Sequence, residues 1–584
     1  MDAPLDRDPA AADRSADPAA DPLATLLRER FGRSAFRPGQ RRIVEHLLAG
    51  GDALVVWPTG GGKSLLFQLP ALLLPDPTLV LSPLIALMDD QVAALRARGI
   101  AASAVHSLLD RAERDARTAD FVAGRTRLLY VTPERFRSEP FVAALAGRRI
   151  GLLAVDEAHC ISAWGHDFRP EYGRVGRIRE RLGRPPTIAL TATATPAVAA
   201  EIRERLALRD PQVDVRGLER PNLFLAAAEL ADGAAKVERI AGRLARLPGA
   251  GIVYSTLIRD LHQLEDELLR RSQRTLVYHG DLSRDERRAM HRRFQQPGAQ
   301  RVLATRAFGM GIDKPDLRFL LHHQLPGSLE ELWQEIGRAG RDGEPSFCEL
   351  LYVEDDLAIQ LEFVRAANPD RRLFRAVASF LAEQAARGAG FDRESLTVAV
   401  GGRRGHDGRI DTCLAWLAAL GVIEGDVASG RARVIRPLDP GDEPAELGAE
   451  KLQRDLVRLQ QVVEWVRAPG CRRAGLARHF GQPASDGPCG ACDRCSDPEA
   501  WLRRELPRMA AAGSAVDPAL AAAAEGAPVL ARGDFVRVDG RWLGRVVRVT
   551  GRGRDALLEV ESSDDLVVRR YPLRRHRIEK VAGG

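Results

Sequence analysis

The sequence predicts an α/β fold with two tandem parallel-sheet domains, followed by smaller C-terminal domains. Short apolar runs alternate with helical segments over residues 23–215, and the alternation returns over residues 216–365. A glycine-rich loop follows the first apolar run, and four cysteines cluster after both repeats. At 584 residues the chain is too long for a single hydrophobic core.

The composition is that of a multidomain globular protein. Hydrophobic residues make up 45% of the chain, charged residues 28%, and no apolar run reaches the roughly 20 residues of a membrane span. Residues 1–22 repeat Asp, Ala and Pro without an apolar core, which predicts a disordered tail and no signal peptide. We therefore expect a cytoplasmic protein with no membrane partner. The net charge of +6 permits a polyanionic partner.

The glycine-rich loop predicts a phosphate-binding site. It separates an apolar run at 53–57, interpreted as a strand, from an apolar segment at 65–74, interpreted as a helix. Glycines let backbone N–H groups turn toward a phosphate, a lysine supplies charge, and a serine hydroxyl can reach Mg²⁺. Trp57 occupies a place where the full pattern has glycine, so an ordinary glycine turn is the alternative. The loop residues are Thr59, Gly60, Gly61, Gly62, Lys63 and Ser64.

Later strand ends of the first domain supply carboxylates. Strands are expected at 78–82, 127–131, 151–155 and 187–191. Their carboxyl ends should meet the glycine loop at one edge of the sheet. Asp156 there can hold Mg²⁺, and Glu157 can orient and deprotonate an attacking water. This combination favours a true phosphate-binding loop over a glycine turn.

The second domain lacks such a loop but carries two arginines. Arg338 and Arg341 are three positions apart, which predicts that they share one helical face. From there they could reach a γ-phosphate across a domain cleft. The expected strands of this domain are 251–255, 275–278, 301–305 and 318–321.

These segments resemble the motifs of superfamily 2 helicases, specifically of the RecQ DNA helicases. The resemblance runs from about residue 31 to residue 352. It is carried by FRPGQ (36–40), PTGGGKS (58–64), LSPLIALM (81–88), DEAH (156–159), AHCISAWGHDFRPEY (158–172), AFGMGIDKP (307–315) and QEIGRAGRDG (334–343).

The resemblance implies two RecA-like motor domains that bind ATP and Mg²⁺. Arg37 and Gln40 would bind the adenine, while Arg33 stands where the family often has a stacking aromatic residue. Magnesium would be held at Ser64 and Asp156. The implied catalytic set is Lys63, Asp156, Glu157, Gln334, Arg338 and Arg341.

The resemblance also implies DNA as the partner, with 3′ to 5′ movement on single strands and unwinding of duplex DNA in repair or recombination. Its aromatic-rich loop would sense single-stranded DNA, although simple packing of these side chains is the alternative. An RNA helicase and a nucleic-acid-binding adaptor with a vestigial motor are the rival functions. The loop residues concerned are Trp164, His166, Phe168 and Arg169.

Beyond the motor, residues 370–438 predict a winged helix, with three helices followed by a hairpin at 422–435. Residues 448–500 predict a zinc-binding helical hairpin, which RecQ proteins usually carry before the winged helix. Four thiolates can close a structural zinc site; disulfides and an iron–sulfur cluster are the alternatives. The cysteines are Cys471, Cys489, Cys492 and Cys495.

The C-terminal end predicts a small separate domain. Residues 501–528 are interpreted as a linker, and its alanine-rich part, residues 509–528, could alternatively form a loose helix. Residues 529–582 contain short alternating runs separated by Gly and Asp turns, which predicts a small SH3-like β-barrel. Its arginines could bind nucleic acid or a protein partner, or could form a solvated face.

Overall fold

The structure is a computed structural model. It describes residues 21–58, 60–162, 172, 175–216, 220–296, 298, 300–308, 314–387, 393–401, 407–424, 433–439, 449–484 and 487–513, and five strands after residue 534. Contacts divide the chain into two units, 1–513 and 514–584.

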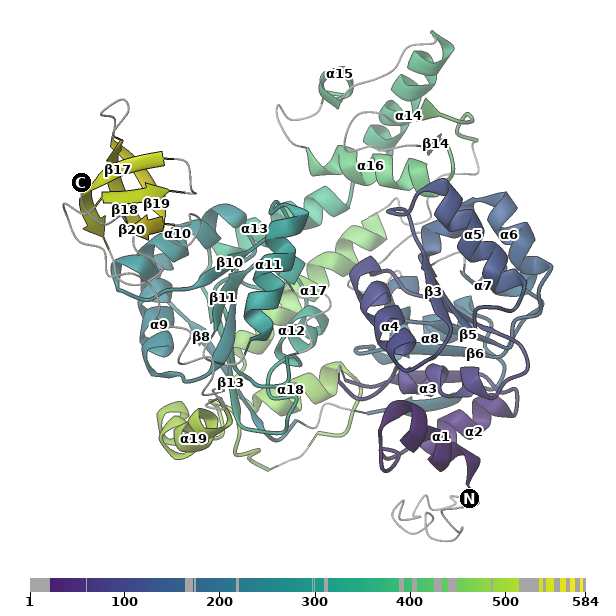
Figure 1. Ribbon diagram of the computed structural model, residues 1–584, viewed down its shortest axis with the longest axis horizontal. Coiled ribbons are helices and arrows are strands. Elements are labelled where there is room, and N and C mark those ends of the chain that lie inside the picture. The colour runs from purple at the N-terminus through teal and green to yellow at the C-terminus, as the bar shows by residue number, and fades with distance from the viewer. Residues whose placement is uncertain are drawn as a thin grey trace. The chain divides into compact units, whose positions relative to one another are not determined.

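The first domain, coloured purple to blue in Figure 1, contains a parallel sheet. The sheet has seven strands, and every pair of neighbours is parallel. The expected strands are present, and two short ones were not expected: β3, whose small residues carry little strand signal, and the half-exposed edge strand β7. In spatial order the strands are β3 (Ala102–Val105), β4 (Leu128–Val131), β2 (Thr78–Leu81), β5 (Leu152–Val155), β6 (Thr187–Thr191), β1 (Ala53–Val56) and β7 (Gln212–Val215).

Helices cover both faces of this sheet. Because side chains alternate along a strand, Val55 joins one buried cluster and Leu54 joins the other. The first cluster includes residues of α1 (Pro22–Phe31), α2 (Gln40–Leu48), α3 (Leu65–Gln68) and α4 (Ile85–Ala97). The second includes residues of α5 (Arg111–Val122), α6 (Glu139–Ala146), α7 (Val175–Arg181) and α8 (Pro196–Arg205).

The helix after the glycine loop is shorter than predicted. Only Leu65–Gln68 is α-helical, and a 3₁₀ turn follows at Pro70–Leu72. Pro70 explains the break, since proline lacks the amide hydrogen and its ring clashes with the preceding helical turn.

The second domain has a six-stranded parallel sheet. Its strand β8 was not expected, because the sequence LFLAAAE is alanine-rich, and β13 was also missed. In spatial order the strands are β10 (Leu276–Tyr278), β11 (Arg301–Ala304), β9 (Ala250–Tyr254), β12 (Leu317–His322), β13 (Ser346–Tyr352) and β8 (Leu223–Glu229).

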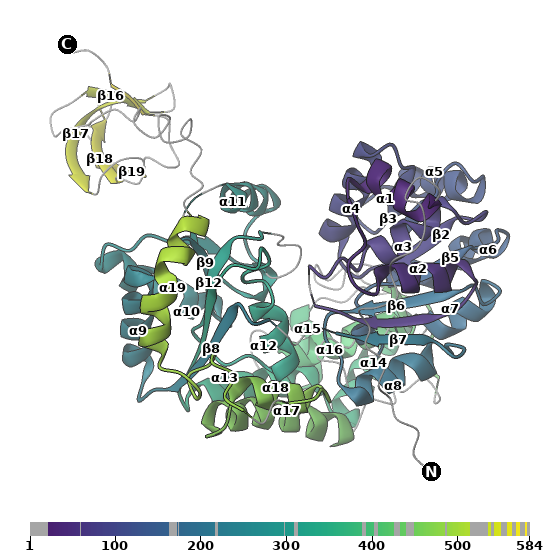
Figure 2. The same cartoon turned by 90° about the horizontal axis from the view of Figure 1, so that it is seen from below.

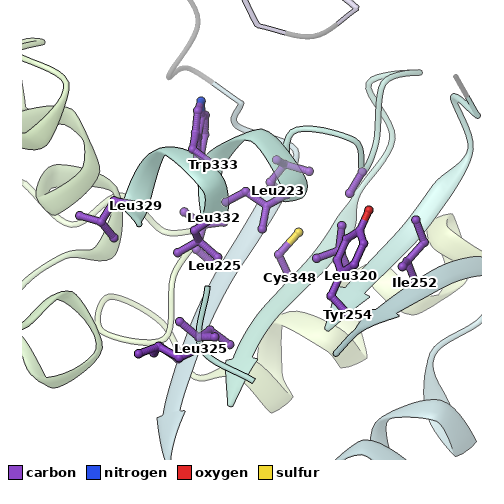
Figure 3. Packing of buried hydrophobic residues seen from close by; sticks show 14 of the residues in the cluster. Leu223, Leu225, Ile252, Tyr254, Leu320, Leu325, Leu329, Leu332, Trp333 and Cys348 are labelled. Carbon is purple, nitrogen blue, oxygen red and sulfur yellow. The ribbon is translucent and has the colours of Figure 1, made fainter. Parts of the chain in front are cut away.

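Helices also cover both faces of the second sheet. Figure 3 shows apolar side chains of α12 above those of the strands beneath it, with Leu332 close to Leu223 and Leu225. This cluster includes residues of α11 (Arg284–Gln295) and α12 (Leu329–Ile336). The opposite cluster includes residues of α9 (Gly233–Arg246) and α10 (Ile258–Arg270). Helix α13 (Asp356–Ala367) follows β13.

The region after the second sheet contains three helices and one antiparallel strand pair around its own buried cluster. These are the elements expected of a winged helix, whose assignment stays a prediction. The expected hairpin turn falls outside the described residues. The elements are α14 (Arg371–Ala386), α15 (Arg393–Ala399), α16 (Gly408–Ala419), β14 (Ile423–Glu424) and β15 (Arg433–Val434).

Three further helices follow: α17 (Ala449–Arg467), α18 (Arg472–His479) and α19 (Pro498–Gly513). The prediction of a linker is wrong for residues 501–513, whereas the alternative of a helix from Met509 is confirmed as far as Gly513. Helix α19 lies along the second sheet (Figure 2), where Trp501, Leu502 and Met509 are buried. The Trp501 ring lies 4.9 Å from that of Phe224. These three apolar side chains lie on one helical face, a pattern that the linker interpretation overlooked.

The second unit contains a five-stranded antiparallel sheet in the order β19-β18-β17-β16-β20. Its assignment as an SH3-like barrel stays a prediction, and β20 was not among the expected strands. The strands are β16 (Phe535–Val538), β17 (Trp542–Thr550), β18 (Leu557–Ser562), β19 (Val568–Pro572) and β20 (Ile578–Lys580). In the described part of the chain, no helix has the length and apolar character needed to cross a membrane.

Candidate nucleotide site and zinc centre

One cavity of about 700 Å³ gathers residues of both α/β domains at the carboxyl ends of their strands. The first domain contributes the glycine loop, the carboxylate pair and the segment before α2, and the second contributes three side chains. Thr59 lies outside the described residues. The predicted residues that line the cavity are Arg33, Arg37, Gln40, Gly60, Gly62, Lys63, Ser64, Asp156, Glu157, Gln334, Arg338 and Arg341.

The glycine loop requires its glycines. Gly60 and Gly62 have φ angles of 80° and 82°, which other residues rarely adopt. At Gly61, an added Cβ would lie 2.9 Å from the Pro58 carbonyl oxygen. The loop backbone is therefore compact enough to curl around a phosphate.

Lys63 lies folded against this loop. Its ammonium group donates hydrogen bonds to the Trp57 and Pro58 carbonyl oxygens, at 2.8 and 3.2 Å. Burial lowers the pKa of Lys63, and the nearby Glu157 and Asp156 carboxylates oppose this shift. An anionic phosphate would oppose it further, so the site suits a charged lysine with a polyanionic ligand.

The carboxylate pair follows β5. Burial, and then the neighbouring Glu157, raise the pKa of Asp156 to about 7. A cation bound beside Ser64 and Asp156 would compensate both effects, which fits Mg²⁺. Glu157 adopts a left-handed φ of 49°, and its Oε2 lies 3.3 Å from Nδ1 of His159. The same Nδ1 of His159 lies 2.9 Å from the Thr191 hydroxyl oxygen.

Arg37 and Gln40 both contact the glycine loop. Gln40 Nε2 donates to the Gly62 carbonyl oxygen at 3.1 Å, and its Oε1 accepts from the Arg37 amide at 2.8 Å. The Arg37 guanidinium donates to the Gly60 carbonyl oxygen. The predicted adenine-binding side chains thus brace the predicted phosphate-binding backbone.

Arg338 and Arg341 enter the cavity from a turn. The prediction that they share a helical face is wrong, because α12 ends at Ile336 and both arginines follow it. We call residues 337–343 the arginine turn. Gly340 has a φ of 56°, and an added Cβ there would meet the Asn222 amide at 2.5 Å, so glycine permits this tight turn.

The arginine side chains suit an anionic ligand. Arg338 is 7% exposed, and its Nε is buried with no hydrogen-bond partner among the described residues. A Cβ placed on Gly60 would lie 3.4 Å from Arg341 Cδ, so Arg341 packs against the glycine loop. Sequence reasoning missed Arg220, which binds the backbone of the arginine turn and has no local sequence signal.

The four predicted cysteine ligands also come together. Their sulfur atoms all lie within 4.8 Å of one another, and Cys471 and Cys492 are 3.9 Å apart. A tetrahedral zinc with bonds of about 2.3 Å separates its sulfur ligands by about 3.8 Å, so the cluster fits zinc. All four cysteines are free thiols in the structure, which does not support the disulfide alternative.

The cysteine loop docks on the second sheet. The Leu225 amide donates to the Ala491 carbonyl oxygen and the Asp493 amide donates to the Leu225 carbonyl oxygen, both at 3.0 Å. The buried Arg472 guanidinium pairs with Asp493 at 2.9 Å. The cysteine loop therefore pairs with backbone groups at the edge of the sheet, which β8 forms.

The predicted DNA-sensing side chains, Trp164, His166, Phe168 and Arg169, lie outside the described residues. Tyr172, at the far end of that loop, donates a hydrogen bond to the Asp156 carbonyl oxygen at 3.0 Å. The role of the loop stays a prediction.

Three family models match the chain in sequence order: DEAD/DEAH box helicase at 37–202, helicase conserved C-terminal domain at 235–343 and RecQ zinc-binding at 433–496. A similar curated protein is the probable ATP-dependent DNA helicase RecS of Bacillus subtilis. It is 40% identical over 348 residues, which cover 59% of this chain and 69% of that protein. The ATP-dependent DNA helicase RecQ of a Synechocystis species is 34% identical over 483 residues, covering 81% of this chain and 98% of that protein. This chain belongs to the RecQ family.

Family membership identifies both α/β domains as RecA-like and the cysteine cluster as the RecQ zinc site, in preference to an iron–sulfur cluster. Some RecQ relatives extend well beyond the matched region. The chain covers 58% of the RecQ protein of Pasteurella multocida, at 37% identity over 370 residues.

Proposed function

We propose that this chain is an ATP-dependent helicase that moves 3′ to 5′ along single-stranded DNA and unwinds duplex DNA in repair or recombination, in the cytoplasm. The observation that carries the proposal is the single cavity in which a glycine loop and a carboxylate pair of one domain face two arginines of the other. Such a site hydrolyses nucleotide only when both domains contribute, which couples hydrolysis to domain movement.

Each side chain has a role in this proposal. Lys63 neutralises phosphate charge, and Ser64 and Asp156 would hold Mg²⁺, which supplies charge neutralisation when bound. Glu157, braced by His159, orients the attacking water and takes its proton. Arg338 and Arg341 stabilise the charge that develops as the phosphoryl bond breaks, and Gln334 lies beside them in the cavity.

DNA is favoured over RNA as the substrate. The Bacillus and Synechocystis relatives are named as DNA helicases, and the RecQ zinc-binding model matches residues 433–496 of this chain. The adaptor alternative would not require Glu157 and both arginines to line one cavity.

The test is steady-state ATP hydrolysis with no nucleic acid, with single-stranded DNA and with RNA of equal length. We expect strong stimulation by DNA alone. The Lys63→Ala variant should lose about 100-fold or more in kcat while keeping its DNA affinity. Equal stimulation by RNA would favour the RNA helicase, and unchanged turnover in the variant would overturn the proposal.

A further inference from the structure

We infer that Arg216 and Arg220 are positioning residues for the two halves of the nucleotide cavity, one on each side of the connection between the RecA-like domains. Arg216 follows the last strand of the first sheet, and Arg220 precedes the first strand of the second. They are four positions apart and belong to none of the motif segments described above. The inference rests on the proposed function, because it assigns them to nucleotide binding and hydrolysis.

Arg216 belongs to a cluster centred on Asp214. The Asp214 side chain is 4% exposed and accepts hydrogen bonds from Trp57 Nε1 at 2.8 Å and from Arg42 at 2.9 Å. Arg216 also binds this carboxylate, and its guanidinium lies 5.2 Å from the centre of the Trp57 ring. A third contact is a 2.6 Å hydrogen bond from Arg216 to the Pro38 carbonyl oxygen.

These contacts join two parts of the nucleotide site. Trp57 directly precedes the glycine loop, and Pro38 lies between Arg37 and Gln40. Gly39 has a φ of 74°, and a Cβ there would collide with the Arg216 guanidinium. Arg216 therefore packs directly under the backbone from which the adenine-binding side chains project.

Arg220 organises the arginine turn in a comparable way. Its guanidinium donates to the carbonyl oxygens of Gly337 at 3.1 Å, of Gly340 at 2.9 Å and of Ala339. Asn222 adds a 2.8 Å hydrogen bond to the same Gly340 oxygen. A guanidinium carries N–H donors on three nitrogen atoms in one plane, so it can reach several separated carbonyl oxygens at once. The donors of a lysine ammonium group all sit on one nitrogen atom, so lysine cannot reproduce this arrangement.

The bound carbonyls flank Arg338 and precede Arg341. Because Arg220 holds three of them, it sets the direction in which both cavity arginines leave the backbone. The zinc region supports Arg220 from outside: Arg473, in α18, donates to the Arg220 carbonyl oxygen at 2.6 Å. The turn is thus held without using the side chains that face the ligand.

The two residues should affect different steps. Loss of Arg216 loosens the adenine side, which is formed before hydrolysis, so binding weakens. Loss of Arg220 loosens Arg338 and Arg341, which act mainly as charge develops on the phosphoryl group in the transition state. The kcat should therefore fall while the affinity for the nucleotide is preserved.

The experiment measures equilibrium binding of a fluorescent ATP analogue and DNA-stimulated kcat and KM in the full chain. We expect Arg216→Ala to raise Kd and KM about tenfold with kcat within about twofold. Arg220→Ala should lower kcat about 100-fold with Kd within about threefold, and Arg220→Lys should not restore it. Arg177→Ala, at an exposed arginine of α7, is the control and should change neither.

Thermal unfolding of each variant establishes that it folds. The inference is overturned if both variants change Kd and kcat in parallel, if either matches the Arg177 control, or if Arg220→Lys behaves as wild type. Failure of the proposed function is distinguishable, because wild-type protein would then lack DNA-stimulated turnover, or Lys63→Ala would retain it. The nucleotide-binding measurement stays readable in both cases.

Discussion

A buried histidine in the second RecA-like domain makes stability depend on pH at the level of a single residue. His323 follows β12, and its Nδ1 lies 3.3 Å from the Ser255 hydroxyl. Its own carbonyl oxygen accepts a 2.6 Å hydrogen bond from Lys236, which is paired with buried Asp356. Burial, and then the charge of Lys236, lower the pKa of His323 to about 4. The imidazole is therefore neutral in the folded protein at neutral pH.

We expect stability to fall as the pH drops from about 6.5 toward 4. The folded-state pKa is depressed, so the unfolded chain binds the extra proton first, and the stabilising contribution is complete only above the unfolded value. The loss between about pH 7.5 and pH 5 should be about 2 kcal/mol. Chemical denaturation at both pH values measures it.

The matched variant is His323→Gln, which cannot titrate in this range. Its free energy of unfolding should change less between the two pH values, by the same amount of about 2 kcal/mol. An identical pH dependence in both proteins would contradict the assignment of this effect to His323.

At the level of elements, the cysteine loop pairs with β8 and holds the four zinc ligands. The three cysteines outside the zinc site are buried, and burial raises the pKa of Cys348 and of Cys413 to about 12. They are therefore unreactive while the protein is folded. Only the four zinc ligands should respond to metal removal.

We predict that a chelator releases zinc and makes four of the seven cysteines reactive toward a thiol reagent. Counting modified thiols by mass spectrometry, with and without chelator, gives the result. Cys492→Ser should show three reactive thiols before any chelator is added, because the site is already broken. Modification of Cys160 or Cys348 alongside the ligands would mean that metal loss unfolds the motor domains as well.

Helix α19 is a second element-scale feature, because it covers one face of the second sheet. Trp501→Ala should destabilise the protein by about 3 kcal/mol, since it removes a buried ring packed on Phe224 and Phe347. Arg503→Ala, on the exposed side of the same helix, should cost less than about 0.5 kcal/mol. Equal costs would show that α19 is held by something other than this apolar face.

For the molecule as a whole, the division into residues 1–513 and 514–584 predicts that the first unit folds and hydrolyses ATP without the second. Residues 1–513 contain both parallel sheets, the nucleotide cavity and the zinc site. A chain ending at Gly513 should therefore fold, bind zinc and hydrolyse ATP with kcat within about twofold of the full chain. DNA-stimulated hydrolysis and zinc analysis of the shortened protein test this.

The same shortened chain reports on the second unit. If the shortened chain has a lower DNA affinity at unchanged kcat, the strands after residue 534 contribute to binding nucleic acid. An unchanged DNA affinity would favour a protein partner for these strands. Loss of zinc or of folding on shortening would contradict the division into two units.

The parallel-sheet class, the glycine loop, the carboxylate pair and the zinc ligands could be predicted from the sequence. These features are local: a buried parallel strand is a continuous apolar run, and the phosphate loop and cysteine spacing are read within a few residues. Edge strands such as β7 were missed because a half-exposed edge carries no such run.

The contacts between groups that are distant in the sequence could not be predicted in this way and are seen only in the folded chain. Arg216 contacts a carbonyl oxygen 178 positions away. Arg220 binds carbonyl oxygens of the arginine turn that lie 117 to 120 positions away. The structure also placed Arg338 and Arg341 beyond the end of α12 and turned part of an alanine-rich linker into a core helix. Such contacts depend on the packing of whole sheets and helices, which no short stretch of sequence encodes.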